Sequence, residues 1–120
     1  MSKAKGQQRS AFIKSAIQNG GQAIFYLLKC TSQDESFYKL GISVNHILTR
    51  YGSPKAMPYE WTIVLEYPDT PESIYDLESS FKGQMEQYHY TPSIPFNGSK
   101  TECYSNLTEE LQNLVFEVNN

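Results

Sequence analysis

The 120-residue sequence lacks the features of membrane and secreted proteins. It has no apolar run near the roughly 20 residues that cross a bilayer, and no early apolar stretch of the secretory-signal type. It contains two cysteines, too few for a disulfide framework. We therefore expect a cytoplasmic protein that does not bind membranes. The length matches one domain with a modest core.

Three kinds of site are also missing from the sequence. The cysteines and histidines lack the close-paired spacing of a zinc site. These residues are Cys30, Cys103, His46 and His89. Gly20-Gly21 precedes an expected strand instead of joining a strand to a helix, so we find no Gly-rich phosphate loop. Cys30 lies in an apolar stretch, where we expect an inert thiol that fills core space and not a nucleophile.

Apolar periodicity predicts a small α/β domain of the α+β type. Residues 23–30 and 37–42 are aliphatic, aromatic and β-branched, and the polar segment between them predicts a β-hairpin. A third strand is expected at residues 61–67. We thus expect a three-stranded antiparallel sheet flanked by helices. A basic N-terminal helix or arm would occupy residues 1–21, and the main domain residues 22–120.

Four helices are expected from spacing and capping residues. The first covers residues 7–19 and stops at two glycines. The second runs through residues 46–50, and the third opens at Thr70-Pro71-Glu72 and fades near residues 88–90. The fourth covers residues 108–117. Glu102 follows a loop that precedes this fourth helix.

Four side chains with complementary chemistry stand out in this framework. Cutting a phosphodiester needs a base for water, cations against the developing charge and an anchor for a divalent metal. A phenol, an ammonium, a guanidinium and a carboxylate can supply these functions. They belong to Tyr26, Lys39, Arg50 and Glu102. Their ordered occurrence indicates a phosphodiester-cleaving site more strongly than any one of them alone.

The expected hairpin can bring the first of these residues together. Alternation along a strand places Lys39 on the same face as Gly41. His46 and Arg50 are four residues apart and therefore share a helical face. Gly41 leaves space where that face could approach the strand that carries Lys39. We therefore expect His46 and Arg50 near the hairpin.

In its motifs the chain resembles the GIY-YIG nuclease superfamily. Phe25-Tyr26 stands in the first tyrosine motif and Lys39-Leu40-Gly41 in the second. Arg50 stands at the helix arginine, and Glu102 at the late metal-binding glutamate. The chain is most similar to the phage-type branch, in which a lysine replaces the tyrosine of the second motif. The resemblance covers roughly residues 22–106 and implies the same α+β arrangement.

The resemblance implies a small Mg²⁺- or Mn²⁺-dependent endonuclease. DNA is the expected substrate, although the sequence does not distinguish DNA from RNA. Glu102 would hold the metal, and Tyr26 would act as general base on the attacking water. A phenol has a pKa near 10, and the Lys39 ammonium would lower it by favouring the phenolate. Arg50, together with His46, would stabilise charge on the phosphate.

Several of these residues have alternative interpretations. His46 is equally well explained as a surface residue. Tyr38 is expected on the face opposite Lys39, but it becomes the catalytic tyrosine if the strand register differs. Glu102 could cap the last helix. Glu78, on the third helix, is expected to be solvated and not metal-bound.

The charge distribution is uneven along the chain. The net charge is −3 and the pI about 5.3, unlike a typical nucleic-acid binder. Residues 1–60 carry eight basic and three acidic side chains, whereas residues 61–120 carry two basic and ten acidic ones. The basic half could dock on a phosphate backbone, although separate helices explain the asymmetry equally well. The expected nucleic-acid contacts are Lys3, Lys5, Arg9, Lys14 and Lys55.

Two other functions remain open from the sequence. One is a catalytically inactive nucleic-acid-binding module that keeps the fold. The other is an adaptor or inhibitor that uses the acidic half on a basic protein. A nuclease of this size would need a homodimer or a protein partner to obtain specificity.

Overall fold

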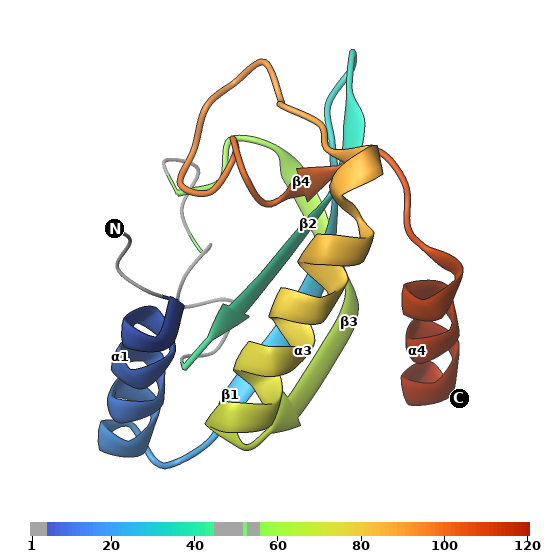
Figure 1. Cartoon of the computed structure of the whole chain (residues 1–120). Coiled ribbons are helices and arrows are strands. Elements are labelled where there is room, and N and C mark those ends of the chain that lie inside the picture. Colours follow the sequence, from blue (N-terminus) through green and yellow to red (C-terminus); the bar gives the residue numbers. More distant parts are fainter. Residues whose placement is uncertain (1–4, 45–51, 53–55) are drawn as a thin grey trace.

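The computed structural model describes residues 5–44, 52 and 56–120, with side chains from residue 8 onward in the first helix. Over this part the chain forms the expected α+β fold, with helices on a four-stranded antiparallel sheet (Figure 1). The helix expected through residues 46–50 falls outside the described residues. No helix in the described part is long and apolar enough to span a bilayer.

The predicted hairpin is present. It consists of β1 (Ala23–Thr31) and β2 (Ser36–Ser43), paired in antiparallel register. The hydroxyl oxygen of Ser32 accepts hydrogen bonds from the backbone N–H groups of Asp34 and Glu35, at 3.3 and 3.2 Å. These bonds close the polar turn that the sequence indicates.

The sheet has one strand more than the three that the sequence predicts. Its order is β3-β1-β2-β4, where β3 is Glu60–Asp69 and β4 is Cys103–Tyr104. β4 has only two residues, too few to show an alternating pattern. The register of β3 against β1 shifts at Val64, because Leu65 pairs with Leu27 while Ile63 pairs with Leu28.

The described helices begin and end close to where the sequence places them. They are α1 (Lys5–Gln18), α3 (Pro71–Gln84), the short 3₁₀ helix η1 (Glu86–Tyr88) and α4 (Glu109–Asn119). The hydroxyls of Thr70 and Thr108 cap α3 and α4 by accepting backbone N–H bonds. After α1, Gly20 and Gly21 adopt φ values of 113° and 82°, which L side chains rarely adopt.

Two apolar clusters fill the two faces of the sheet. Figure 1 shows α3 lying across one face, with α4 and α1 to either side. The first cluster joins that face to α3 and α4 through Phe25, Leu27, Leu40, Ile74, Phe81 and Leu111. The second cluster covers the opposite face with Tyr26, Leu28, Cys30, Phe37, Met57, Tyr59 and Cys103.

α1 packs against α3. The guanidinium of Arg9 makes two hydrogen bonds to the Asp76 carboxylate, at 2.9 and 3.0 Å. The rings of Phe12 and Tyr75 lie 5.9 Å apart between centroids. The N-terminal helix is thus held on the main domain by an ion pair and an aromatic contact.

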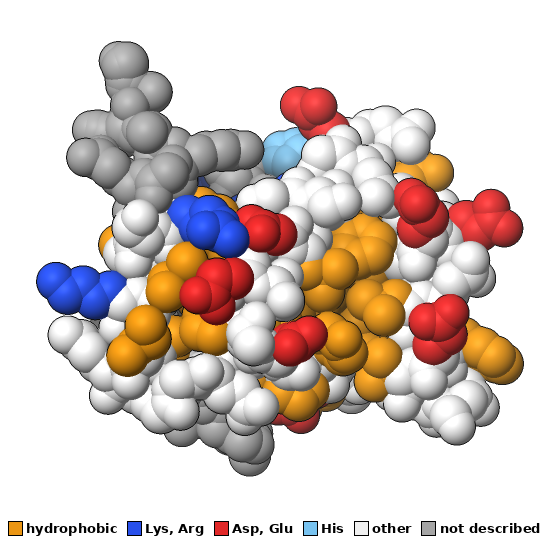
Figure 2. Space-filling model, turned by 60° about the horizontal axis from the view of Figure 1, so that its bottom comes forward, with side chains coloured by type: hydrophobic (Ala, Val, Ile, Leu, Met, Phe, Trp, Pro, Cys, Tyr) orange, Lys and Arg blue, Asp and Glu red, His pale blue; other side chains and the backbone are white. Residues whose placement is uncertain are grey.

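Acidic side chains are prominent on the face that Figure 2 shows. They border an apolar area, while the Lys and Arg side chains lie toward one side of the view (Figure 2). This agrees with the acidic composition of residues 61–120.

Candidate functional site

Tyr26 and Lys39 lie on the same face of the hairpin. The register pairs Tyr26 with Gly41 and Leu28 with Lys39, and directly opposed residues share a face in antiparallel strands. Both side chains have a relative exposure of 0%. A fully buried lysine is rare because its charge must be compensated inside the protein. The buried Lys39 ammonium therefore requires a negatively charged partner.

The phenol of Tyr26 occupies the space above Gly41. A Cβ atom added at Gly41 would lie 2.5 Å from Cζ of Tyr26, closer than real Cβ contacts come. The sequence suggests that Gly41 leaves room for the helix that carries His46 and Arg50. In the structure Tyr26 fills that room, while His46 and Arg50 lie outside the described residues.

The Lys39 ammonium contacts both other described members of the predicted site. It forms an ion pair with Oε1 of Glu102, and it lies 5.5 Å from the centroid of the Tyr26 ring. Glu102 reaches it because β4 pairs with β2, which places Cys103 opposite Lys39. The backbone carbonyl of Glu102 also accepts the N–H of Leu40 at 2.9 Å.

A tight turn holds Glu102 against Lys39. The N–H of Glu102 donates to the carbonyl of Gly98 at 2.9 Å, and Gly98 has a φ of 89°. A Cβ atom at Gly98 would lie 2.5 Å from Oε1 of Glu102 and 3.2 Å from Nζ of Lys39. Glycine at this position therefore permits both the backbone conformation and the ion pair.

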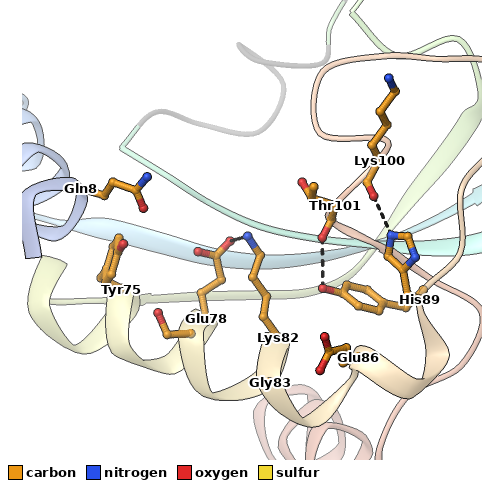
Figure 3. Close-up of a pocket in the computed structure, with 11 residues that line it drawn as sticks. Gln8, Tyr75, Glu78, Lys82, Gly83, Glu86, His89, Lys100 and Thr101 are labelled. Atoms are coloured by element: carbon orange, nitrogen blue, oxygen red, sulfur yellow. Dashed lines mark hydrogen bonds and ion pairs between the residues drawn. The ribbon is translucent and has the colours of Figure 1, made fainter. Parts of the chain in front are cut away.

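The charges continue from Glu102 to α3. Nζ of Lys82 lies 3.6 Å from Oε2 of Glu102 and 3.7 Å from Oε2 of Glu78. The four side chains therefore alternate in sign from buried Lys39 through Glu102 and Lys82 to Glu78. Figure 3 shows the Lys82–Glu78 end of this series.

Glu78 is buried, which corrects the expectation that it is solvated. Its relative exposure is 7%. It stands four residues after Ile74 and three before Phe81, both of which are buried on the sheet-facing side of α3. This spacing is the sequence signal from which the burial of Glu78 could have been predicted. A carboxylate within an apolar stripe needs a positive partner, and Lys82 supplies one.

A pocket of about 720 Å³ adjoins the Lys82 end of the charge series (Figure 3). It lies between α1, α3 and the segment that leads into β4. Its lining comprises Gln8, Tyr75, Glu78, Ser79, Lys82, Gly83, Glu86, His89, Lys100, Thr101 and Tyr104. Lys82 lines the pocket and lies 3.6 Å from Oε2 of Glu102. The pocket therefore adjoins the Glu102 carboxylate of the candidate site.

Tyr38 lies on the other face of the sheet. It packs against the first apolar cluster, and Nζ of Lys29 lies 4.6 Å from the centroid of its ring. Tyr38 therefore does not meet Lys39 and Glu102, and the alternative register in which it would replace Tyr26 is wrong.

The predicted nucleic-acid contacts are only partly described. Arg9 is paired with Asp76, and Lys14 is exposed on α1. Lys5 begins α1, but its side chain lies outside the described part. Lys3 and Lys55 lie outside the described residues altogether.

Both cysteines are buried, free thiols beside the candidate site. Burial raises the pKa of Cys30 and of Cys103 to about 12, although the nearby Lys39 ammonium opposes this shift. Thiols that stay protonated are poor nucleophiles and poor metal ligands. This confirms Cys30 as a buried side chain of the core.

Glu102 and Glu78 could offer oxygen ligands to a divalent cation of the kind that the family resemblance implies. Glu102 and Glu78 already share one cation, the Lys82 ammonium, whose side chain is 34% exposed. Carboxylate oxygens are the ligands that Mg²⁺ prefers, together with water and phosphate oxygens. Within the described part, no cluster of three or more His, Cys, Asp or Glu side chains could hold a metal. Substrate and water would therefore have to complete the coordination.

Comparison of the chain with protein-family models, with curated proteins and with solved structures gives no match.

Proposed function

We propose that this protein is a small cytoplasmic endonuclease of the GIY-YIG type, which hydrolyses DNA with the help of a divalent metal ion. The observation that carries the proposal is the contact of Lys39 with both Tyr26 and Glu102. Tyr26 lies in β1, Lys39 in β2 and Glu102 directly before β4. Their convergence supports a common role.

The residues of the chain have distinct roles in this proposal. The Tyr26 phenolate oxygen takes a proton from water while the water oxygen bonds to phosphorus. The bond to the leaving oxygen breaks, and this oxygen takes up a proton from solvent. The Lys39 ammonium, which lies 5.5 Å from the centroid of the Tyr26 ring, is the nearby positive charge in this proposal. Arg50 and His46, outside the described residues, would neutralise charge on the phosphate.

In this proposal Glu102 would hold the metal ion, and Glu78, which lies near the same Lys82 ammonium, would be a second ligand. Bound Mg²⁺ or Mn²⁺ would supply charge neutralisation at the phosphate oxygens. Lys82 would then exchange its contacts with the two carboxylates for a contact with the substrate phosphate.

The second candidate function is a nucleic-acid-binding module without catalytic activity. The burial of Tyr26 and Lys39, each with 0% exposure, favours it. In the arrangement that the structure shows, water and phosphate do not reach the Tyr26 ring from solvent. An active enzyme must therefore open this face when it binds its substrate.

Incubation with supercoiled plasmid DNA and Mg²⁺ tests the proposal. We expect wild-type protein to nick and linearise the plasmid, and EDTA to stop the reaction. Glu102→Gln should lower the rate on the order of 100-fold, because the carboxylate loses its charge. Glu117→Gln, at an exposed position on α4, is the matched control and should cut at the wild-type rate.

One result would contradict the nuclease, and another would contradict the proposed role of Glu102. Binding of DNA without cleavage in either Mg²⁺ or Mn²⁺ would favour the inactive module. Cleavage by folded Glu102→Gln at the wild-type rate would remove Glu102 from the proposed metal site.

A further inference from the structure

The pocket beside Lys82 is lined largely by polar side chains, whereas Tyr26 and Lys39 are fully buried in the sheet. Its wall combines hydrogen-bonding side chains, such as Gln8 and Ser79, with the ring of half-buried Tyr75. Gly83 lies in the same wall, and a Cβ atom added there would meet nothing within 4 Å. Figure 3 shows Gln8, Tyr75 and Gly83 among the residues of this wall. The pocket is therefore open and is not filled by a neighbouring side chain at Gly83.

We propose that this pocket binds one unpaired nucleotide. The inference rests on the proposed function and specifies its substrate, a strand with at least one base outside the duplex stack. The base would lie against Tyr75, since aromatic rings are stacking partners for any base. Gln8 and Ser79 would offer hydrogen bonds to its edge.

Lys82 connects the nucleotide to the candidate active site. Its separations from Glu78 and Glu102, 3.7 and 3.6 Å, are longer than hydrogen bonds. The ammonium therefore keeps N–H donors for a further acceptor, and the phosphate of a bound nucleotide supplies one. A phosphate placed there lies next to the Glu102 carboxylate.

The size and charge of the pocket favour an unpaired base over a duplex. About 720 Å³ lies in the usual range of small-ligand pockets, roughly 300–1,000 Å³. A base inside a duplex is stacked and paired, so it enters a pocket only when it leaves the stack. The lining holds two lysines, Lys82 and Lys100, against two glutamates, Glu78 and Glu86. Because these positive and negative charges cancel, the pocket has no net electrostatic attraction for a phosphate backbone. Selective binding must therefore come from contacts with the base.

Gly83 allows a test that blocks the pocket without disturbing the core. Gly83→Met places a long side chain in the open space, whereas Gly83→Ala adds a single methyl group at the same position. Both replacements are compatible with a helix. Thermal unfolding would confirm that the two variants are folded.

Binding is measured by fluorescence anisotropy with Ca²⁺ in place of Mg²⁺, so that cleavage does not interfere. The probes are a labelled single strand, its duplex, and the duplex with one unpaired nucleotide. We expect the single strand and the bulged duplex to bind more tightly than the perfect duplex. Gly83→Met should weaken their binding by about tenfold relative to Gly83→Ala, the loss of one stacked base.

The outcomes separate this inference from the nuclease proposal. Equal affinities of Gly83→Met and Gly83→Ala, or equal affinities for single strand and perfect duplex, would overturn the pocket assignment even if plasmid is cut. Pocket-dependent binding without cleavage would support the pocket and refute the nuclease. Competition by a free deoxynucleoside monophosphate would show that the pocket accepts nucleotides from solution as well as from a strand.

Discussion

The Lys39 ammonium and the Glu102 carboxylate form an ion pair where β4 joins the edge of β2. Lys39 has no exposed surface, and the Glu102 side chain is 22% exposed. Glu102 therefore compensates a buried charge in addition to its proposed role as a metal ligand. Experiments on Glu102 must distinguish these two roles.

We expect Glu102→Gln to lower the free energy of unfolding by about 1–3 kcal/mol. The amide oxygen can still accept a hydrogen bond from Lys39, but it no longer neutralises the buried ammonium. Urea unfolding followed by circular dichroism would measure the change. Glu117→Gln, at an exposed position, should stay within about 0.5 kcal/mol of wild type. A Glu102→Gln variant as stable as wild type would show that the ion pair contributes nothing to folding.

Tyr26→Phe and Tyr38→Phe form a matched pair for the catalytic proposal. Both remove one hydroxyl from the hairpin, and phenylalanine preserves the packing of the ring. Tyr26 lies on the Lys39 face and Tyr38 on the opposite face. We expect Tyr26→Phe to lower the cleavage rate by about 10² to 10⁴, the usual effect of losing a general base. Tyr38→Phe should stay near the wild-type rate.

A different ranking in the same plasmid assay would refute this assignment. If Tyr26→Phe cleaves at the wild-type rate, the buried phenol is a packing residue. If only Tyr38→Phe loses activity, the chemistry lies on the other face of the sheet.

Gly41→Ala should destabilise the protein by about 1–3 kcal/mol. The added methyl group would collide with the Tyr26 phenol, which is itself packed and cannot move without cost. Gly83→Ala is the contrasting control, because its methyl group meets nothing within 4 Å and alanine favours a helix. We expect Gly83→Ala to stabilise α3 by roughly 0.5–1 kcal/mol. Equal midpoints of urea unfolding for the two variants would contradict the close contact.

The Glu35 carboxylate ties the hairpin turn to the segment before β4. It accepts hydrogen bonds from the hydroxyls of Ser93, Tyr90 and Tyr59, the last two at 2.6 and 2.7 Å, and from the Ser93 N–H at 3.0 Å. These bonds, with the Ser93 hydroxyl contributing most, lower the pKa of Glu35 from 4.5 to about 2. The carboxylate form is thus the one that the fold stabilises.

Because the folded-state pKa lies below the unfolded one, this stabilisation is fully present above about pH 4.5 and is lost as the pH falls toward 2. We expect the thermal midpoint of wild type to drop over this range. Glu35→Gln should show a shallower drop, since its amide does not titrate. Asp34→Asn, at the exposed neighbouring position, is the control and should follow the wild-type profile. Parallel profiles for wild type and Glu35→Gln would show that Glu35 does not link folding to pH in this range.

The elements of this fold were largely determined by local sequence. Alternating apolar residues on either side of a polar turn are sufficient to predict the hairpin of β1 and β2. Threonine caps before α3 and α4, and the glycine pair after α1, mark helix ends because each acts on backbone groups a few residues away. The face shared by Lys39 and Gly41 likewise follows from the period of a strand.

Contacts between distant segments were decided only by the tertiary structure. Lys39 and Glu102 are 63 residues apart, and they meet because two residues of β4 pair with β2. Arg9 and Asp76, 67 residues apart, meet because α1 packs on α3. Local patterns do not encode such pairings, since each depends on how whole elements bury their apolar faces. For the same reason Tyr26, Lys39 and Glu102 could be selected from the sequence only by residue type and motif, whereas their burial and the position of Glu78 near them depend on packing.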